Sequence, residues 1–76
     1  MTEAREKLTE TIDSLIKEKL TQMGKCRYCF DLYYYFLENG FKDIARLIDE
    51  VNIFRIEYIK SIDSLIDKIR KHQGWL

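Results

Sequence analysis

The apolar residues in the first half of the chain recur every three or four positions, which is the spacing of one face of an α-helix. The pattern comprises Ala4, Leu8, Ile12, Leu15, Ile16, Leu20, Met23, Cys26, Phe30, Tyr33 and Leu37. It keeps its phase through Gly24, and a lone glycine costs a helix only about 1 kcal/mol relative to alanine. We therefore predict one helix over about residues 2–38, with a break at Gly24 as the alternative.

A second apolar pattern begins after Asn39, Gly40 and Phe41. Asparagine and glycine tolerate the left-handed backbone that ends many helices, and the phenylalanine can supply the apolar contact that follows. Residues in phase are Ile44, Ile48, Val51, Tyr58, Ile62, Leu65 and Ile69, and the pattern is widened by Leu47, Phe54, Ile59 and Ile66. The sequence therefore predicts a turn over 39–41 and a second, antiparallel helix over about 42–73, ended by Gly74.

The segment Ile-Asp-Ser-Leu-Ile occurs twice, at residues 12–16 and 62–66. In a hairpin that turns near Gly40, residues lie at the same height when their numbers add up to about 80. The two copies then lie nearly opposite each other. We expect each copy to place its aliphatic side chains in the core and its Asp and Ser outside.

Length and composition indicate an all-α protein with a single domain over residues 1–76. The chain has 76 residues, of which 46% are hydrophobic and 34% charged, with no proline and three glycines. Both apolar patterns are wider than a two-helix contact uses, and a chain this small often completes its core by association. We therefore predict a homodimeric four-helix bundle, with a monomeric three-helix bundle broken at Gly24 as the alternative.

The charge balance argues against several classes of partner. Thirteen basic and thirteen acidic residues cancel, so no overall positive field attracts nucleic acid or an anionic membrane. The longest apolar run, residues 32–37, is far shorter than the roughly 20 residues that span a bilayer, and the first residues lack the apolar stretch of a signal peptide. We expect a cytoplasmic protein that does not bind membranes.

Two cysteines, Cys26 and Cys29, form a C-x-x-C motif. One such motif supplies two thiolates, so a dimer could build a four-cysteine zinc site from two copies. Cysteine is also readily buried, and residues three apart share a helix face, so both side chains can simply belong to the core. We expect burial without a cofactor, and keep metal binding as an alternative function.

Tyrosines cluster near the predicted turn, where Tyr28, Tyr33, Tyr34 and Tyr35 accompany Phe30 and Phe36. These rings cannot all face one core, so some must reach the surface. Tyr28, Tyr34 and Tyr35 are the candidates for a protein-binding patch, because tyrosine is a frequent interface anchor. The alternative is that they fill a dimer contact near the turn.

Catalysis has little support in the sequence. The single histidine, His72, lies in a basic helix end where it suits the helix dipole, and no nucleophile has a base beside it. The same helix end, with Lys68, Arg70 and Lys71, offers nucleic-acid binding as a further alternative. We predict a non-enzymatic homodimer that regulates, scaffolds or adapts a protein partner.

The stretch L-E-N-G-F-K-D-I-A-R-L-I, residues 37–48, resembles the turn of ferritin-like, rubrerythrin-type hairpins. That family carries glutamate and Glu-x-x-His ligands for a di-iron site in the bundle. At the corresponding positions this chain has Gln22, Arg55 and Tyr58, none of which is a suitable iron ligand. The resemblance implies a hairpin without the metal centre, in which Arg55 forms a core hydrogen bond or ion pair instead.

Overall fold

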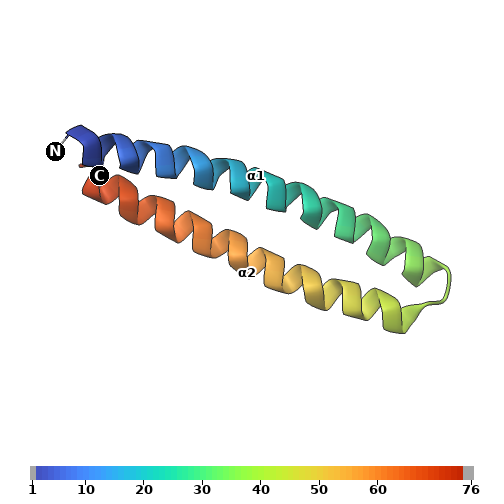
Figure 1. Cartoon of the computed structure of the whole chain (residues 1–76). Coiled ribbons are helices and arrows are strands. Elements are labelled where there is room, and N and C mark those ends of the chain that lie inside the picture. Colours follow the sequence, from blue (N-terminus) through green and yellow to red (C-terminus); the bar gives the residue numbers. More distant parts are fainter. Residues whose placement is uncertain (1, 75–76) are drawn as a thin grey trace.

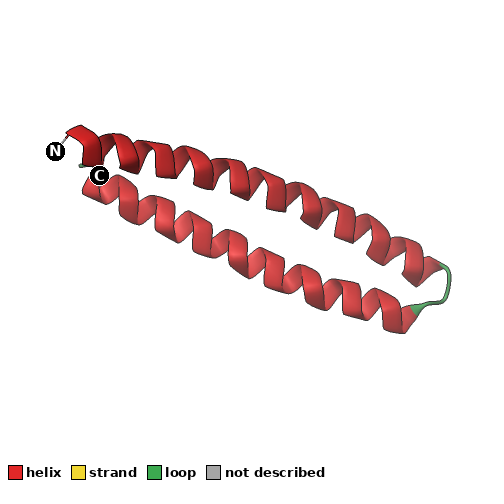
Figure 2. Ribbon diagram, in the orientation of Figure 1, coloured by secondary structure: helices red, strands yellow, loops and turns green. Residues whose placement is uncertain are grey.

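Two long antiparallel helices joined by a short turn make up the protein, as the computed structural model shows for residues 2–74 (Figure 1). Helix α1 spans Thr2–Glu38 and helix α2 spans Lys42–His72. Figure 2 shows that the turn is the connection between them, and the described part of the chain contains no strand. The predicted all-α hairpin is confirmed. Because α1 continues through Gly24, the alternative with a break at this residue is wrong.

The turn follows from the local chemistry of three residues. Gly40 has a φ of 87°, in the left-handed region, and its N–H donates to the carbonyl of Leu37 at 3.2 Å. The N–H of Phe41 donates to the carbonyl of Phe36 at 2.9 Å, which completes a Schellman motif. The rings of Phe36 and Phe41 lie 6.0 Å apart, so the apolar contact expected from the sequence is present.

The hairpin is a rod. Its principal extents are 58 × 15 × 15 Å and its radius of gyration is 17.2 Å. A compact domain of this length would have a radius of gyration of about 11 Å. Two helices side by side enclose no interior, so each helix can bury only the strip that faces the other.

The buried strip, which we call the seam, repeats every seven residues on both helices. Its α1 positions are Leu8, Ile12, Leu15, Lys19, Gln22, Cys26, Cys29, Tyr33 and Phe36. Its α2 positions are Ala45, Ile48, Asn52, Arg55, Ile59, Ile62, Ile66, Ile69 and Gln73. Every one of these side chains is buried or half-buried. A strict seven-residue repeat is the geometry of helices that supercoil around each other.

The core of the seam lies near the chain ends. Ile12, Ile62, Ile66 and Ile69 form a buried cluster, against which Leu8, Leu15 and Ile16 pack. Toward the turn the buried residues are small or polar, namely Cys26, Ala45 and Asn52. The most efficient apolar packing is therefore at the open end of the hairpin.

The predicted apolar patterns do not coincide with the seam in the middle of the chain, so that part of the prediction is wrong. Residues of the predicted apolar patterns that are found exposed are Ala4, Leu20, Met23, Phe30, Leu37, Ile44, Leu47, Val51, Phe54, Tyr58 and Leu65. A straight helix repeats every 3.6 residues, so its apolar face drifts by about 20° per seven residues relative to a supercoiled contact. The straight-helix phase therefore passes from the seam to the neighbouring strip.

The two copies of the repeated segment are similar in the structure but not equivalent. Ile12, Ile62 and Ile66 are buried, and Ser14 and Ser64 are exposed, as expected. Leu65, however, is 46% exposed, so the expectation that it lies in the core is wrong. The two copies of the segment therefore face each other in the core through their isoleucines only.

Candidate interaction surface

Each helix carries a second apolar strip beside the seam. The α2 outer stripe consists of Ile44, Leu47, Val51, Phe54, Tyr58 and Leu65, and the α1 outer stripe of Leu20, Met23, Phe30, Tyr34 and Leu37. The residues of both stripes follow the three-and-four spacing that is typical of a surface packed against another helix, but the other helix of the hairpin does not cover them. Among the described residues, fourteen of the fifteen exposed large apolar side chains lie between residues 20 and 58. The surface available for interaction is thus concentrated in the part of the rod that includes the turn.

The two outer stripes lie on opposite faces of the hairpin. The α2 outer stripe borders an apolar groove of 260 Å³ that is lined by Cys29, Leu32, Ile44, Leu47, Ile48 and Val51. We call this side the groove face. Phe30 of the α1 outer stripe is rotated by about 100° from Cys29, away from the groove. On this opposite face, a second hollow brings Leu20 and Met23 beside Asp63, Asp67 and Arg70.

The two faces therefore differ in chemistry. The groove between the helices on the groove face is lined only by apolar side chains and a cysteine. The hollow on the opposite face is lined by charged residues of α2 as well as apolar residues of α1. An apolar groove suits a permanent contact, whereas a mixed surface is typical of contacts that form and dissociate.

The three tyrosines predicted to bind a partner are all exposed, but they do not form one patch. Tyr34 belongs to the α1 outer stripe, and its ring packs edge-on against Tyr33 with centroids 5.3 Å apart. Tyr28 and Tyr35 are seven residues apart and so lie on one line, at the edge of the groove face. Tyr33 is half-buried in the seam. The cluster is divided among the seam and two surfaces.

The two cysteines are free thiols in different surroundings. Cys26 is buried in the seam, as its phase predicted, and Cys29 is half-buried at the groove. Within the described residues, no three His, Cys, Asp or Glu side chains are grouped so that they could hold a metal ion. A zinc site shared by two copies would require Cys26 to leave the seam. It stays an alternative prediction that elemental analysis of the purified protein would test.

A short chain of polar contacts crosses the middle of the seam. Arg55 Nη1 donates to Gln22 Oε1 at 2.7 Å, and Gln22 Nε2 donates to Glu18 Oε1 at 2.8 Å. Arg55 therefore forms a part-buried hydrogen bond across the seam. Gln22 and Arg55, one from each helix, thus bind each other.

Asn52 is the buried polar residue that the sequence did not reveal. It is 2% exposed, and its side-chain Oδ1 has no hydrogen-bond partner among the described residues. Its seven-residue spacing from Ala45 and Ile59 places it in the seam. This spacing is the feature of the sequence that could have revealed the burial of Asn52, because a search for hydrophobic residues does not select asparagine.

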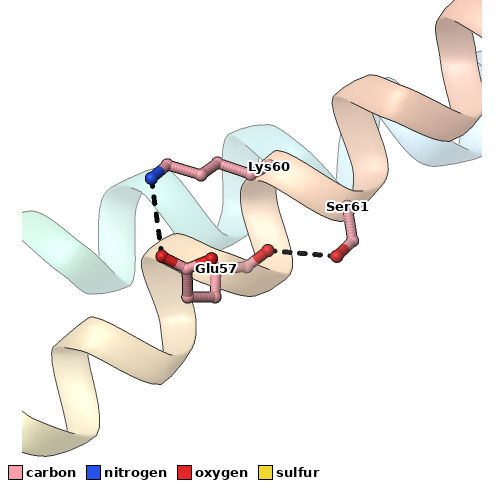
Figure 3. A network of polar contacts seen from close by, with 3 residues as sticks. All are labelled: Glu57, Lys60 and Ser61. Carbon is pink, nitrogen blue, oxygen red and sulfur yellow. Dashed lines mark hydrogen bonds and ion pairs between the residues drawn. The ribbon is translucent and has the colours of Figure 1, made fainter.

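Charged side chains cover the outer surface of α2. Lys60 Nζ lies 3.4 Å from Glu57 Oε1, and the hydroxyl of Ser61 donates to the carbonyl of Glu57 at 3.1 Å (Figure 3). Both charged side chains of this pair are about two-thirds exposed, so the pair contributes little to stability. Glu57 is therefore available for a contact outside the chain.

The basic end of α2 is not an isolated positive patch. Lys68, Arg70 and Lys71 belong to the end of α2, which lies beside the start of α1 (Figure 1). Arg70 shares its hollow with Asp63 and Asp67, and the acidic residues Glu3, Glu6 and Glu10 belong to the same end. The neighbouring carboxylates reduce the local positive potential that nucleic-acid binding would require.

Over residues 2–74, neither helix combines the length and apolarity needed to cross a membrane. The chain has no significant match among protein-family models, curated proteins or solved structures.

Proposed function

We propose that this protein is a non-catalytic interaction module that works as a homodimer and binds a protein partner. The large total accessible surface, together with fifteen exposed large apolar side chains among the described residues, carries the proposal. The chain exposes 6182 Å², whereas a folded monomer of its mass exposes about 4900 Å². The difference exceeds the roughly 800 Å² that each partner contributes to a standard protein interface. A second chain would cover surface that the hairpin leaves in water.

The presence of two apolar faces supports a role beyond self-association. A homodimer formed by one face of the hairpin leaves the other face on the outside of both copies. The opposite face has exposed aromatic and methionine side chains beside charged residues of α2, a composition typical of protein interfaces. The proposed dimer thus presents two copies of one binding surface, as a scaffold or adaptor does.

Sedimentation equilibrium tests the dimer. We expect a species of about 18 kDa, twice the 9.2 kDa chain, at micromolar concentration. A monomer at every concentration up to the millimolar range would contradict the proposed function.

The partner surface is tested by comparing three forms of the tagged protein in extracts of its native cell. The unmodified protein and a Lys17→Gln control should retain the same partner, because Lys17 is exposed on the outer side of α1 and lies outside both apolar stripes. Phe30→Gln on the opposite face should lose the partner and remain dimeric. Equal recovery with all three forms would show that the opposite face is not the binding surface.

A further inference from the structure

The position of the exposed apolar side chains along the rod determines how two copies fit together. We infer that they pack groove face to groove face with both turns at the same end, so that α2 of each copy lies beside α1 of the other. This inference rests on the proposed homodimer and specifies its geometry. Neighbouring helices in such a bundle remain antiparallel, as in most four-helix bundles.

The first reason is the uneven distribution of apolar surface. The groove and most of the α2 outer stripe lie in the part of the rod nearest the turn. With the turns at the same end, Ile44 and Val51 of one copy lie at the height of Leu32 in the other, because height-matched residues add up to about 80. Apolar surface then covers apolar surface.

The reverse arrangement, with turns at opposite ends, matches these surfaces poorly. Full overlap would place Ile44 and Leu47 of one copy over the end of α2 in the other, where the groove face carries Lys68 and His72. Burying apolar side chains against charged ones removes the charges from water without a partner. A slipped register would restore apolar contacts but would shorten the overlap of the two rods.

The second reason is charge. Lys25 is exposed on α1, seven residues before Leu32 and therefore on the same groove-face line. At the same height on α2 are Tyr58, on the groove face, and Glu57, which lies about 100° farther round the helix at the outer edge of that face. With the turns together, Lys25 of each copy approaches Glu57 of the other. Residue 57 is the midpoint of α2. With the turns at opposite ends, α2 of one copy lies along α2 of the other, so the two copies of Glu57 would be at the same height near the twofold axis.

The area to be buried is consistent with a full-length contact. Each chain exposes 6182 Å², and a compact dimer of twice the mass would expose about 8200 Å² in total. About 4000 Å² would thus be buried, within the range of permanent homodimers. A compact dimer therefore requires overlap along most of the rod, which a short slipped contact does not provide.

Double electron–electron resonance between spin labels measures the arrangement. A keto amino acid introduced at Asn39, in the exposed turn, accepts a nitroxide label and leaves both native cysteines unchanged. We expect a distance between the two labels of about 20–40 Å, since helices in a bundle lie about 10 Å apart and the labels add to this. A label at exposed Thr9, near the open end, should give a similar distance. Distances approaching the 58 Å length of the rod at both sites would overturn the inference and leave the dimer intact.

Two matched substitutions identify the contact face. Val51 and Ile53 are both β-branched residues of α2, 55% and 50% exposed, but Val51 belongs to the groove face and Ile53 projects toward the opposite face. Val51→Lys should raise the dimer dissociation constant by at least about 100-fold, and Ile53→Lys by less than about threefold. Neither side chain supports the seam, so circular dichroism should show both variants to be helical. A dimer weakened by Ile53→Lys and not by Val51→Lys would overturn the choice of face.

A charge exchange tests the pairing of helices across the dimer. Lys25→Glu should weaken the dimer severalfold by placing like charges together, and adding Glu57→Lys should recover most of the loss. Recovery requires the two residues to be neighbours, which holds only with the turns at the same end. A double variant as weak as the product of the single variants would contradict the proposed pairing. A wild-type protein that never dimerises would instead contradict the proposed function.

Discussion

The half of the hairpin near the chain ends and the half near the turn bury different kinds of side chain. At the open end, Ile12, Ile62, Ile66 and Ile69 fill the seam, and Leu65 is the only large apolar residue exposed among those described there. In the turn half the seam contains Cys26, Ala45 and Asn52, while the bulky side chains lie outside it. The turn half is also the more apolar, with 23 hydrophobic residues among the 40 at positions 20–59 and 12 among the other 36, and the placement of these residues around the helices differs.

This difference assigns separate tasks to the two halves. Branched aliphatic side chains in the seam hold the two helices together within one chain, because burying each contributes about 1.5–3 kcal/mol. Exposed leucine, phenylalanine and tyrosine contribute nothing until another molecule covers them. The seam near the chain ends therefore holds the two helices of one chain together. The exposed apolar side chains near the turn are available to bind another molecule.

The strongest test of this comparison is truncation of the seam at the open end. Ile66→Ala removes a side chain that is 5% exposed and should lower the free energy of unfolding by about 2–4 kcal/mol. Leu65→Ala, one residue away, should cost less than half as much. Urea unfolding at one fixed protein concentration measures both. Equal losses would show that the two residues share the core after all.

The second test exchanges polar residues in the seam of the turn half. Asn52→Leu replaces a buried amide whose oxygen has no hydrogen-bond partner with an apolar side chain of similar size. We expect the free energy of unfolding to rise by about 1–2 kcal/mol.

Gln22→Leu is the matched control on the facing helix. It removes the acceptor of the 2.7 Å hydrogen bond from Arg55 and should lower the free energy of unfolding by about 1–3 kcal/mol. The same change in polarity therefore has opposite signs at two seam positions. If both variants were stabilised, the Arg55 contact would have no structural importance.

The comparison also explains which features could be predicted from the sequence. The turn was predictable because its chemistry is local, with a glycine at positive φ and a phenylalanine contact across the end of α1. Helix type and length were predictable because the apolar spacing and the absence of proline agree. Burial of Cys26 and exposure of Tyr28 also followed from the helix periodicity.

The choice of strip in the turn half could not be predicted from hydrophobicity. Both strips there contain enough apolar residues to form a contact, and the outer one is the more apolar. Only the seven-residue spacing shared by Cys26, Asn52 and Arg55 with the open end distinguishes the seam. The groove was not predictable either, because it forms between residues of both helices.

The third test concerns the point where α1 passes from one half to the other. Gly24 is exposed, has a helical backbone, and a methyl group added there would meet no atom within 4 Å. Gly24→Ala should raise the free energy of unfolding by about 0.5–1 kcal/mol, since alanine favours the helix. Gly40→Ala, at a φ of 87°, should lower it by a similar amount. A loss of stability in Gly24→Ala would indicate that α1 bends at this residue.

The smallest expected effect concerns the ion pair at the border of the two halves. Lys19 Nζ lies 2.7 Å from Asp63 Oδ1, but the two side chains are 32% and 48% exposed, so water and salt weaken their attraction. Asp63→Asn should lower the free energy of unfolding by about 0.5 kcal/mol at low ionic strength and by almost nothing at 1 M salt, where charges are screened within about 3 Å. Lys60→Gln removes the longer and more exposed pair with Glu57 and should have no measurable effect at either salt concentration. A salt-independent loss in Asp63→Asn would mean that the carboxylate helps to hold the seam through its short contact with Lys19, and that apolar burial is not the only force that closes the open end.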